Sequence, residues 1–153
     1  MRVSEDELAG VVDLFGGLTR DELTQALTEV AYRAGDDIEE ETVESAISGA
    51  LASYHLVEYC DDDRTLIVAG PRAFPEQPDH AEDLPHIMGI DPRDVDRQSL
   101  GTLVRQRMGD EASAALAGAN EDRMHELVDV SYDLEAWAPV DCTAVRSRID
   151  ARL

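Results

Sequence analysis

The chain contains no lysine. All 13 of its fixed positive charges are arginine, against 34 Asp and Glu, so the formal net charge is -21. Like charges at this density repel one another in dilute buffer and destabilise a compact state, but at about 1 M salt the Debye length falls to about 3 Å and screens them. Arginine is also less strongly hydrated than lysine and pairs with carboxylates through a planar fork. These features predict a cytoplasmic protein of a salt-accumulating halophile.

Aromatic and reactive side chains are also scarce. Phe, Trp and Tyr make up 5% of the chain, and Cys60 and Cys142 stand apart without a CxxC pair, which argues against a disulfide framework and a zinc ribbon. The motifs GxGxxG, GxxxxGK[ST] and GxSxG are absent. No apolar run approaches the roughly 18 residues of a membrane span. We therefore expect a protein that is not an enzyme, has no cofactor and does not contact a membrane.

Two capping boxes predict the first two helices. In each box a Ser or Thr is followed three residues later by Glu, so that side chain and backbone bond reciprocally. Ser4 opens a helix that should stop at Gly16, because apolar residues recur between them at helical spacing. Thr19 opens the second helix in the same way.

A third helix and a hairpin are expected next. Asp36 or Asp37 can cap the helix, and two β-prone runs around an acidic turn predict a hairpin over about residues 56–69. Five of the six prolines then fall within 22 residues, which suggests an extended surface connector over residues 73–95.

Helical periodicity returns after the connector. Leu100 to Met108 predict one helix, EASAALAG predicts a short further one, Asn120 can cap the next, and Asp141 can start the last. The expected fold class is mainly α with a minor α+β part. It is divided into a subdomain at residues 1–72, the proline-rich connector and a C-terminal helical subdomain at residues 96–153.

Three helices followed by a two-stranded hairpin is the element order of a winged helix-turn-helix. LTRDELTQAL resembles the second helix of that family, and VESAISGALASYHLVEYCDDDRTLIVAGP resembles a third helix that runs into the wing. The resemblance covers about residues 4–72. It implies a winged helix-turn-helix-like N-terminal subdomain.

A wider resemblance spans nearly the whole chain. DELAGVVDLFGGLTRDEL, AEDLPHIM and LVDVSYDLEAWAPVD resemble a family of short, acidic haloarchaeal proteins with no assigned function. This resemblance implies a lineage and does not imply an activity.

The segment DHAEDLPH holds the densest set of possible metal ligands. It places His80 and His86 among three carboxylates, and these residue types can bind a divalent metal. The spacing differs from HExxH, and Pro85 argues against a helix through both histidines. We interpret the segment as an acidic loop, with His80 and His86 kept as candidates for a metal-dependent enzyme.

A winged helix suggests DNA binding only by analogy. Groove and phosphate contacts need Arg, Lys, Asn or Gln, whereas residues 38–54, the expected recognition helix, contain four Glu and none of these. A DNA-binding transcription regulator is therefore the alternative interpretation. Its candidate contact residues are Arg64, Arg72, Arg146, Arg148 and Arg152.

The helix expected after Asn120 is apolar on more than one side, as in a helix at the centre of a bundle or at an interface. Its candidate interface residues are Leu127, Val130, Leu134 and Trp137. Aromatic anchors carry much of the binding energy of protein interfaces. The sequence therefore favours a protein-interaction module with a protein partner or a second copy of itself, on a winged-helix-like scaffold.

The charge balance predicts that the fold depends on salt. We expect the melting temperature to be higher in 2 M KCl than in 0.1 M KCl, because 13 arginines cannot offset the repulsion among 34 acids without screening. Thermal melts followed by circular dichroism at both concentrations test this. An unchanged midpoint would contradict the halophilic interpretation.

Overall fold

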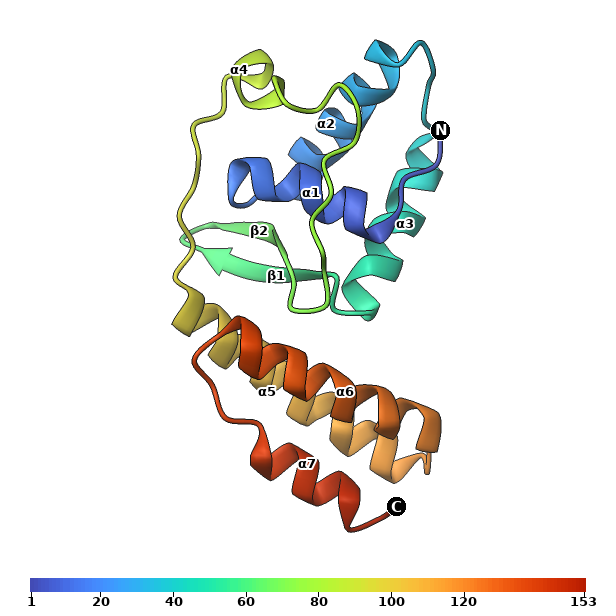
Figure 1. The fold of residues 1–153 in the computed structure, drawn as a ribbon, viewed down its shortest axis with the longest axis vertical. Coiled ribbons are helices and arrows are strands. Elements are labelled where there is room, and N and C mark those ends of the chain that lie inside the picture. The colour runs from blue at the N-terminus through green and yellow to red at the C-terminus, as the bar shows by residue number, and fades with distance from the viewer. The chain divides into compact units, whose positions relative to one another are not determined.

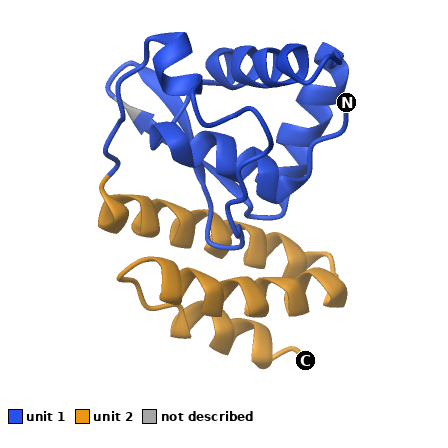
Figure 2. Ribbon diagram, turned by 45° about the horizontal axis from the view of Figure 1, so that its top comes forward, with its two compact units in different colours: residues 1–95 blue, residues 96–153 orange. Residues whose placement is uncertain are grey.

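The computed structural model describes residues 1–60 and 62–153. The fold is mainly helical with a two-stranded antiparallel sheet (Figure 1), which confirms the expected fold class. Residues 1–95 form one compact unit and residues 96–153 a second (Figure 2). Within the described residues, no helix combines the length and the apolar content of a membrane span.

Both predicted capping boxes form and set where the first two helices begin. α1 (Glu5–Phe15) starts after Ser4, whose side chain and backbone bond reciprocally with the residue three positions on, and it ends at Gly16, where φ is +81°. α2 (Arg20–Arg33) starts after Thr19 with the same pair of bonds. Each box satisfies N–H groups that the first turn of a helix cannot pair by itself.

The third helix begins later than predicted. α3 (Glu40–Ala52) has Glu39 at its N-cap without a side-chain hydrogen bond. Asp36 and Asp37 serve the chain's N-terminus instead: the amino group of Met1 forms an ion pair with the Asp36 carboxylate at 3.5 Å and donates to the Asp37 carbonyl at 3.0 Å. The prediction that one of these two residues caps the helix is therefore wrong.

The hairpin lies where the sequence predicts it. β1 (Leu56–Asp61) pairs with β2 (Arg64–Ala69) in antiparallel register. Leu18, between α1 and α2, adds a one-residue bridge to this sheet: its N–H donates to the Ile67 carbonyl at 3.0 Å, and the Ile67 N–H donates back at 2.6 Å. Both side chains are buried in the core of the first unit.

Residues 73–95 belong to the first unit, although their prolines suggest a connector. The segment includes the short helix α4 (Leu84–Met88) and buries Ala81 and Leu84 fully in the core. Prolines exclude a long helix, but they do not prevent the apolar residues between them from packing. The segment also crosses α1 closely enough that a Cβ at Gly10 would lie 2.1 Å from the carbonyl oxygen of Glu76.

The second unit packs three helices on one another: α5 (Arg97–Ala117), α6 (Glu121–Trp137) and α7 (Thr143–Asp150). α5 is one continuous helix where the sequence predicts two. Buried residues precede and follow Gly109, so the packing of the helix holds it together through a residue that disfavours helix.

Polar side chains cap the N-termini of α5 and α6, and a polar side chain one residue before the N-cap position bonds to the first turn of α7. Asp96 accepts from the N–H of Ser99, and Asn120 accepts from the N–H of Arg123, which confirms the cap predicted for α6. Asp141 accepts from the N–H of Thr143 at 2.8 Å, one residue ahead of the N-cap position. Side-chain oxygens thus stabilise these helix starts.

The close crossing at Gly10 yields a stability prediction. We expect Gly10→Ala to destabilise the first unit by about 1–3 kcal/mol, because the new methyl group would displace the backbone of Glu76. Gly49→Ala is the matched control: Gly49 lies in α3 with open space around it, so alanine there should stabilise by up to about 1 kcal/mol. Denaturant melts of both variants measure the difference. A Gly10 variant as stable as the Gly49 variant would contradict this packing.

Candidate interaction surfaces

The exposed face of α3 is acidic. Glu40 and Glu41 are exposed in its first turn, and Glu44 accepts a hydrogen bond from Arg20 of α2 at 2.9 Å. Arg20 is thereby the basic group that the structure brings to this face. The face presents carboxylates where a DNA-reading helix would present donors to phosphates and bases.

The two candidate arginines of the hairpin region do not form a cluster. Arg64 is exposed at the first residue of β2, whereas Arg72 is half-buried beyond the other end of that strand, where its N–H donates to the carbonyl of Tyr54 at 3.1 Å. Asp62 and Asp63 are exposed at the turn, and the third predicted acid of the tip, Asp61, lies outside the described residues. The described part of this tip is therefore mostly acidic.

The predicted metal segment does not form a cluster. His80 lies in a turn with φ of +73°, and His86 lies in α4, with both side chains exposed. Across residues 1–60 and 62–153, no group of three or more His, Cys, Asp or Glu side chains comes together in a way that could hold a metal ion.

Three of the four predicted interface residues are interior. Leu127, Val130 and Leu134 are completely buried, because α6 packs against both α5 and α7. Trp137 remains half-buried, and the Arg97 guanidinium lies 4.2 Å from the centre of its ring. A partner can therefore reach Trp137 but not the other three residues in the folded chain.

The three arginines near the C-terminus have different environments. Arg146 forms two hydrogen bonds with the Glu135 carboxylate, at 2.9 and 3.1 Å, and lies over the ring of Tyr132. Arg148 donates to the Ser113 hydroxyl of α5 at 2.6 Å, and Arg152 is exposed. The ion pair lowers the pKa of Glu135, so Arg146 is committed to joining α7 to α6.

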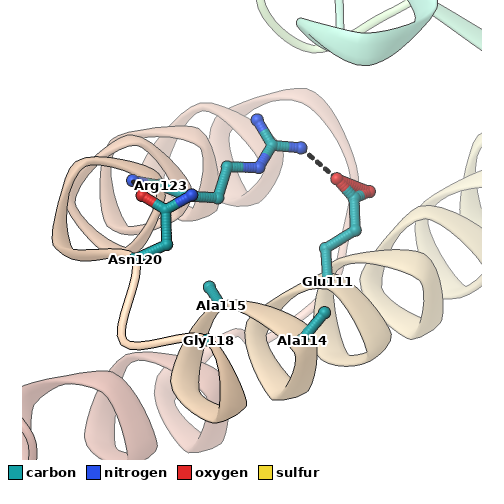
Figure 3. Close-up of a pocket in the computed structure, with 6 residues that line it drawn as sticks. All are labelled: Glu111, Ala114, Ala115, Gly118, Asn120 and Arg123. Atoms are coloured by element: carbon teal, nitrogen blue, oxygen red, sulfur yellow. Dashed lines mark hydrogen bonds and ion pairs between the residues drawn. The ribbon is translucent and has the colours of Figure 1, made fainter.

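An open hollow of about 310 Å³ lies where α5 meets the start of α6 (Figure 3). The side chains of Glu111 and Arg123 point toward each other across it and form an ion pair, while Arg123 also pairs with Glu126. The remaining lining residues are Ala114, Ala115, Gly118 and Asn120. The charged groups in the hollow are thus matched within the protein.

An exposed aromatic residue was not singled out by its sequence pattern. Phe74 is 82% exposed, yet its backbone is fixed: its N–H donates to the Asp6 carboxylate at 3.0 Å, and the Glu76 N–H donates to the Asp6 carbonyl at 3.0 Å. Pro75 further restricts Phe74 to an extended conformation. The signal in the sequence is an aromatic residue directly before a proline in a chain that has few aromatics.

Glu22 and Arg93 join the segment 73–95 to the start of α2. The Arg93 guanidinium donates to both carboxylate oxygens of Glu22, at 2.7 and 2.9 Å, and to the Gly17 carbonyl at 3.0 Å. The same carboxylate accepts from the Thr19 N–H in the capping box. The Arg93 hydrogen bonds are the main cause that lowers the pKa of Glu22 from 4.5 to about 2, and the bonds to Thr19 add to it.

The fold and surfaces define a mainly helical protein of two compact units with a small antiparallel sheet. Residues 6–153 match a family of unknown function, DUF7109, and the chain belongs to that family. The resemblance to a family without an assigned function is thereby confirmed. No curated protein and no solved structure matches the chain.

The Glu22–Arg93 pair predicts how stability depends on pH. A depressed pKa means that the stabilisation is present above pH 4.5 and is lost as the pH falls toward 2. We expect Glu22→Gln to lower the melting temperature at pH 7, and the gap to the native protein to narrow between pH 4.5 and pH 3. Melts in 2 M KCl at pH 7, 4.5 and 3 measure the gap.

Glu7→Gln is the control for this prediction. Glu7 fills the same place in the α1 capping box, and no arginine is paired with it among the described residues. Its substitution should have a smaller effect at pH 7. Equal effects of the two substitutions would show that the capping box, and not the arginine, stabilises this junction.

Proposed function

We propose that this protein is a non-enzymatic protein-interaction module of the haloarchaeal cytoplasm, built on a winged-helix-like scaffold. The absence of lysine and the net charge of -21 support a salt-rich cytoplasm. Its partner is another protein or a second copy of the chain.

The element order supports the winged-helix-like scaffold. Unit 1 runs α1, α2, α3, β1, β2, and the isolated bridge from Leu18 to Ile67 joins the segment between α1 and α2 to the hairpin. The C-terminal helices follow as a separate unit.

The exposure of the Phe74 side chain is the main support for the interaction role. An exposed aromatic side chain on a backbone that is already fixed loses little conformational entropy when a partner buries it. Aromatic anchors of this kind contribute a large share of interface energy. The bonds to Asp6 and the following proline make Phe74 such a preorganised anchor.

Charge on α3 argues against the alternative, a DNA-binding transcription regulator. The exposed first turn of α3 carries Glu40 and Glu41, and the phosphates of DNA would repel these carboxylates. Arg64, the first residue of β2, and Arg72, which lies beyond the other end of that strand, are the regulator's contacts on this unit and do not lie together. The further alternative, a metal-dependent enzyme at His80 and His86, has no third ligand beside them among the described residues.

Substitution of Phe74 tests the proposed function. The native protein and Phe74→Ala, each tagged, are used to purify partners from the native host in 2 M KCl, and affinity is then measured for the partner that mass spectrometry identifies. We expect Phe74→Ala to weaken that affinity about 30-fold, which corresponds to about 2 kcal/mol. Its stability should remain within about 0.5 kcal/mol of the native value, because the lost side chain is exposed.

Tyr32→Ala is the matched control. Tyr32 is 77% exposed in the same unit and its backbone is fixed in the last turn of α2, so it matches Phe74 in exposure and rigidity and differs from it in position. It should retain the partner, and light scattering of all three proteins shows whether the partner is a second copy. Unchanged affinity and unchanged mass in Phe74→Ala would refute the proposed anchor.

A further inference from the structure

One edge of the second unit is rich in arginine. Residues 97–109 and 142–149, from α5 and α7, contain five arginines and no Asp or Glu, and Asp110, Asp141 and Asp150 directly flank the two segments. By contrast, residues 1–95 contain 23 Asp and Glu and six Arg. In a chain so rich in acids, two acid-free segments that pack side by side form an exceptional surface.

Three exposed arginines line this edge, and we call Arg105, Arg148 and Arg152 the arginine edge. Arg105 of α5 donates to the carbonyl of Asp141, just before α7, at 3.4 Å, and Arg148 of α7 donates to Ser113 of α5 at 2.6 Å. The two helices therefore run in the same direction. Because eight residues of helix span about 12 Å, Arg105 and Arg148 lie roughly that far apart along the edge.

These arginines differ from most others in how they are paired. Arg93, Arg123 and Arg146 are held in ion pairs with glutamates, whereas within the described residues neither Arg148 nor Arg152 lies within ion-pair distance of a carboxylate. Asp141 is near Arg105, but its carboxylate is bonded to the N–H and side chain of Thr143. The edge consequently keeps positive charge available to an outside group.

The rest of the edge is polar and small. Thr102, Gly109 and Ser113 share the face of α5 that carries Arg105, since residues three or four apart lie on one side of a helix. Apart from the neighbouring backbone of α5 itself, no atom lies within 4 Å of a Cβ placed at Gly109, so there is space for a side chain there. The hydroxyls of Thr102 and Ser113 already donate to the carbonyls of Gln98 and Gly109. A protein interface would need an apolar anchor at its centre, and this strip offers guanidinium groups as its donors instead.

We propose that the arginine edge binds the phosphate groups of a nucleic-acid backbone. Guanidinium groups match phosphate oxygens in bidentate geometry, and Arg is one of the residues that proteins use for contacts with the nucleic-acid backbone. The proposed binding is independent of base sequence, because contacts to the phosphate backbone carry no sequence information directly. This goes beyond the proposed function: Phe74 in unit 1 binds a protein, and unit 2 holds the complex on nucleic acid.

The number of contacts limits the affinity. Three phosphate contacts give a slope of about -2.7 in a plot of log affinity against log salt for duplex DNA, so binding is weak at molar salt. Contacts of this kind fix the register and orientation of a protein on nucleic acid.

Fluorescence anisotropy tests the proposal with two 20-base-pair DNA duplexes of unrelated sequence. The titrations run in KCl upward from the lowest concentration at which circular dichroism shows the folded protein. We expect equal affinity for both duplexes and a slope of about -2.7, falling to about -0.9 in the double variant Arg148→Gln/Arg152→Gln. At the lowest salt the double variant should bind at least about tenfold more weakly, from the loss of two phosphate contacts.

Arg2→Gln/Arg33→Gln is the matched control, because it removes the same charge from unit 1. It should bind like the native protein. The proposal is overturned if the native protein does not bind DNA, or if the control variant loses as much DNA affinity as the double variant. It is also overturned if polyglutamate of similar length binds as tightly as DNA, because the edge would then be a site for an acidic protein. Phe74→Ala should leave DNA binding unchanged, so the two proposals can fail separately.

Discussion

The hydrogen-bonded ion pair between Glu22 and Arg93 is the contact on which the first unit most depends. One carboxylate completes the cap of α2 and also accepts both donors of an arginine 71 residues further along the chain. The same guanidinium satisfies the Gly17 carbonyl. Because a bidentate pair fixes direction as well as distance, it determines where the segment 73–95 ends on the helical core.

That attachment explains why two positions are glycine: Gly10 within α1, and Gly16 at its C-cap. A Cβ at Gly10 would meet the Glu76 carbonyl oxygen at 2.1 Å, and one at Gly16 would meet that of Arg93 at 1.9 Å. The segment between these crossings buries Ala81 and Leu84. A chain with few aromatics thus enlarges its small aliphatic core by bringing backbone against backbone where only glycine leaves room.

The few arginines of the chain fall into two groups. Arg93, Arg123 and Arg146 form ion pairs with glutamates, and these pairs join elements within each unit. Arg105 and Arg148 of the arginine edge bond only to a carbonyl and a hydroxyl, and among the described residues no carboxylate forms an ion pair with the edge, which is why it stands out as a binding surface. In a protein of net charge -21, the places where arginines lack a carboxylate partner indicate a binding surface as clearly as the places where acids accumulate.

Local signals in the sequence were sufficient for both capping boxes, the hairpin and the cap of α6, because each depends on residues within a few positions of one another. Asp36 had a competing partner in the amino group of Met1, and α5 continued through Gly109 because of packing along its length. The burial of Leu127, Val130 and Leu134, the fixing of Phe74 by Asp6 and the alignment of Arg105 with Arg148 join residues distant in the chain. The sequence by itself therefore determined the charge, the starts of α1, α2 and α6, and the fold class. The tertiary structure alone decided which side chains remain at the surface to bind a partner, since exposure depends on contacts that local pattern does not encode.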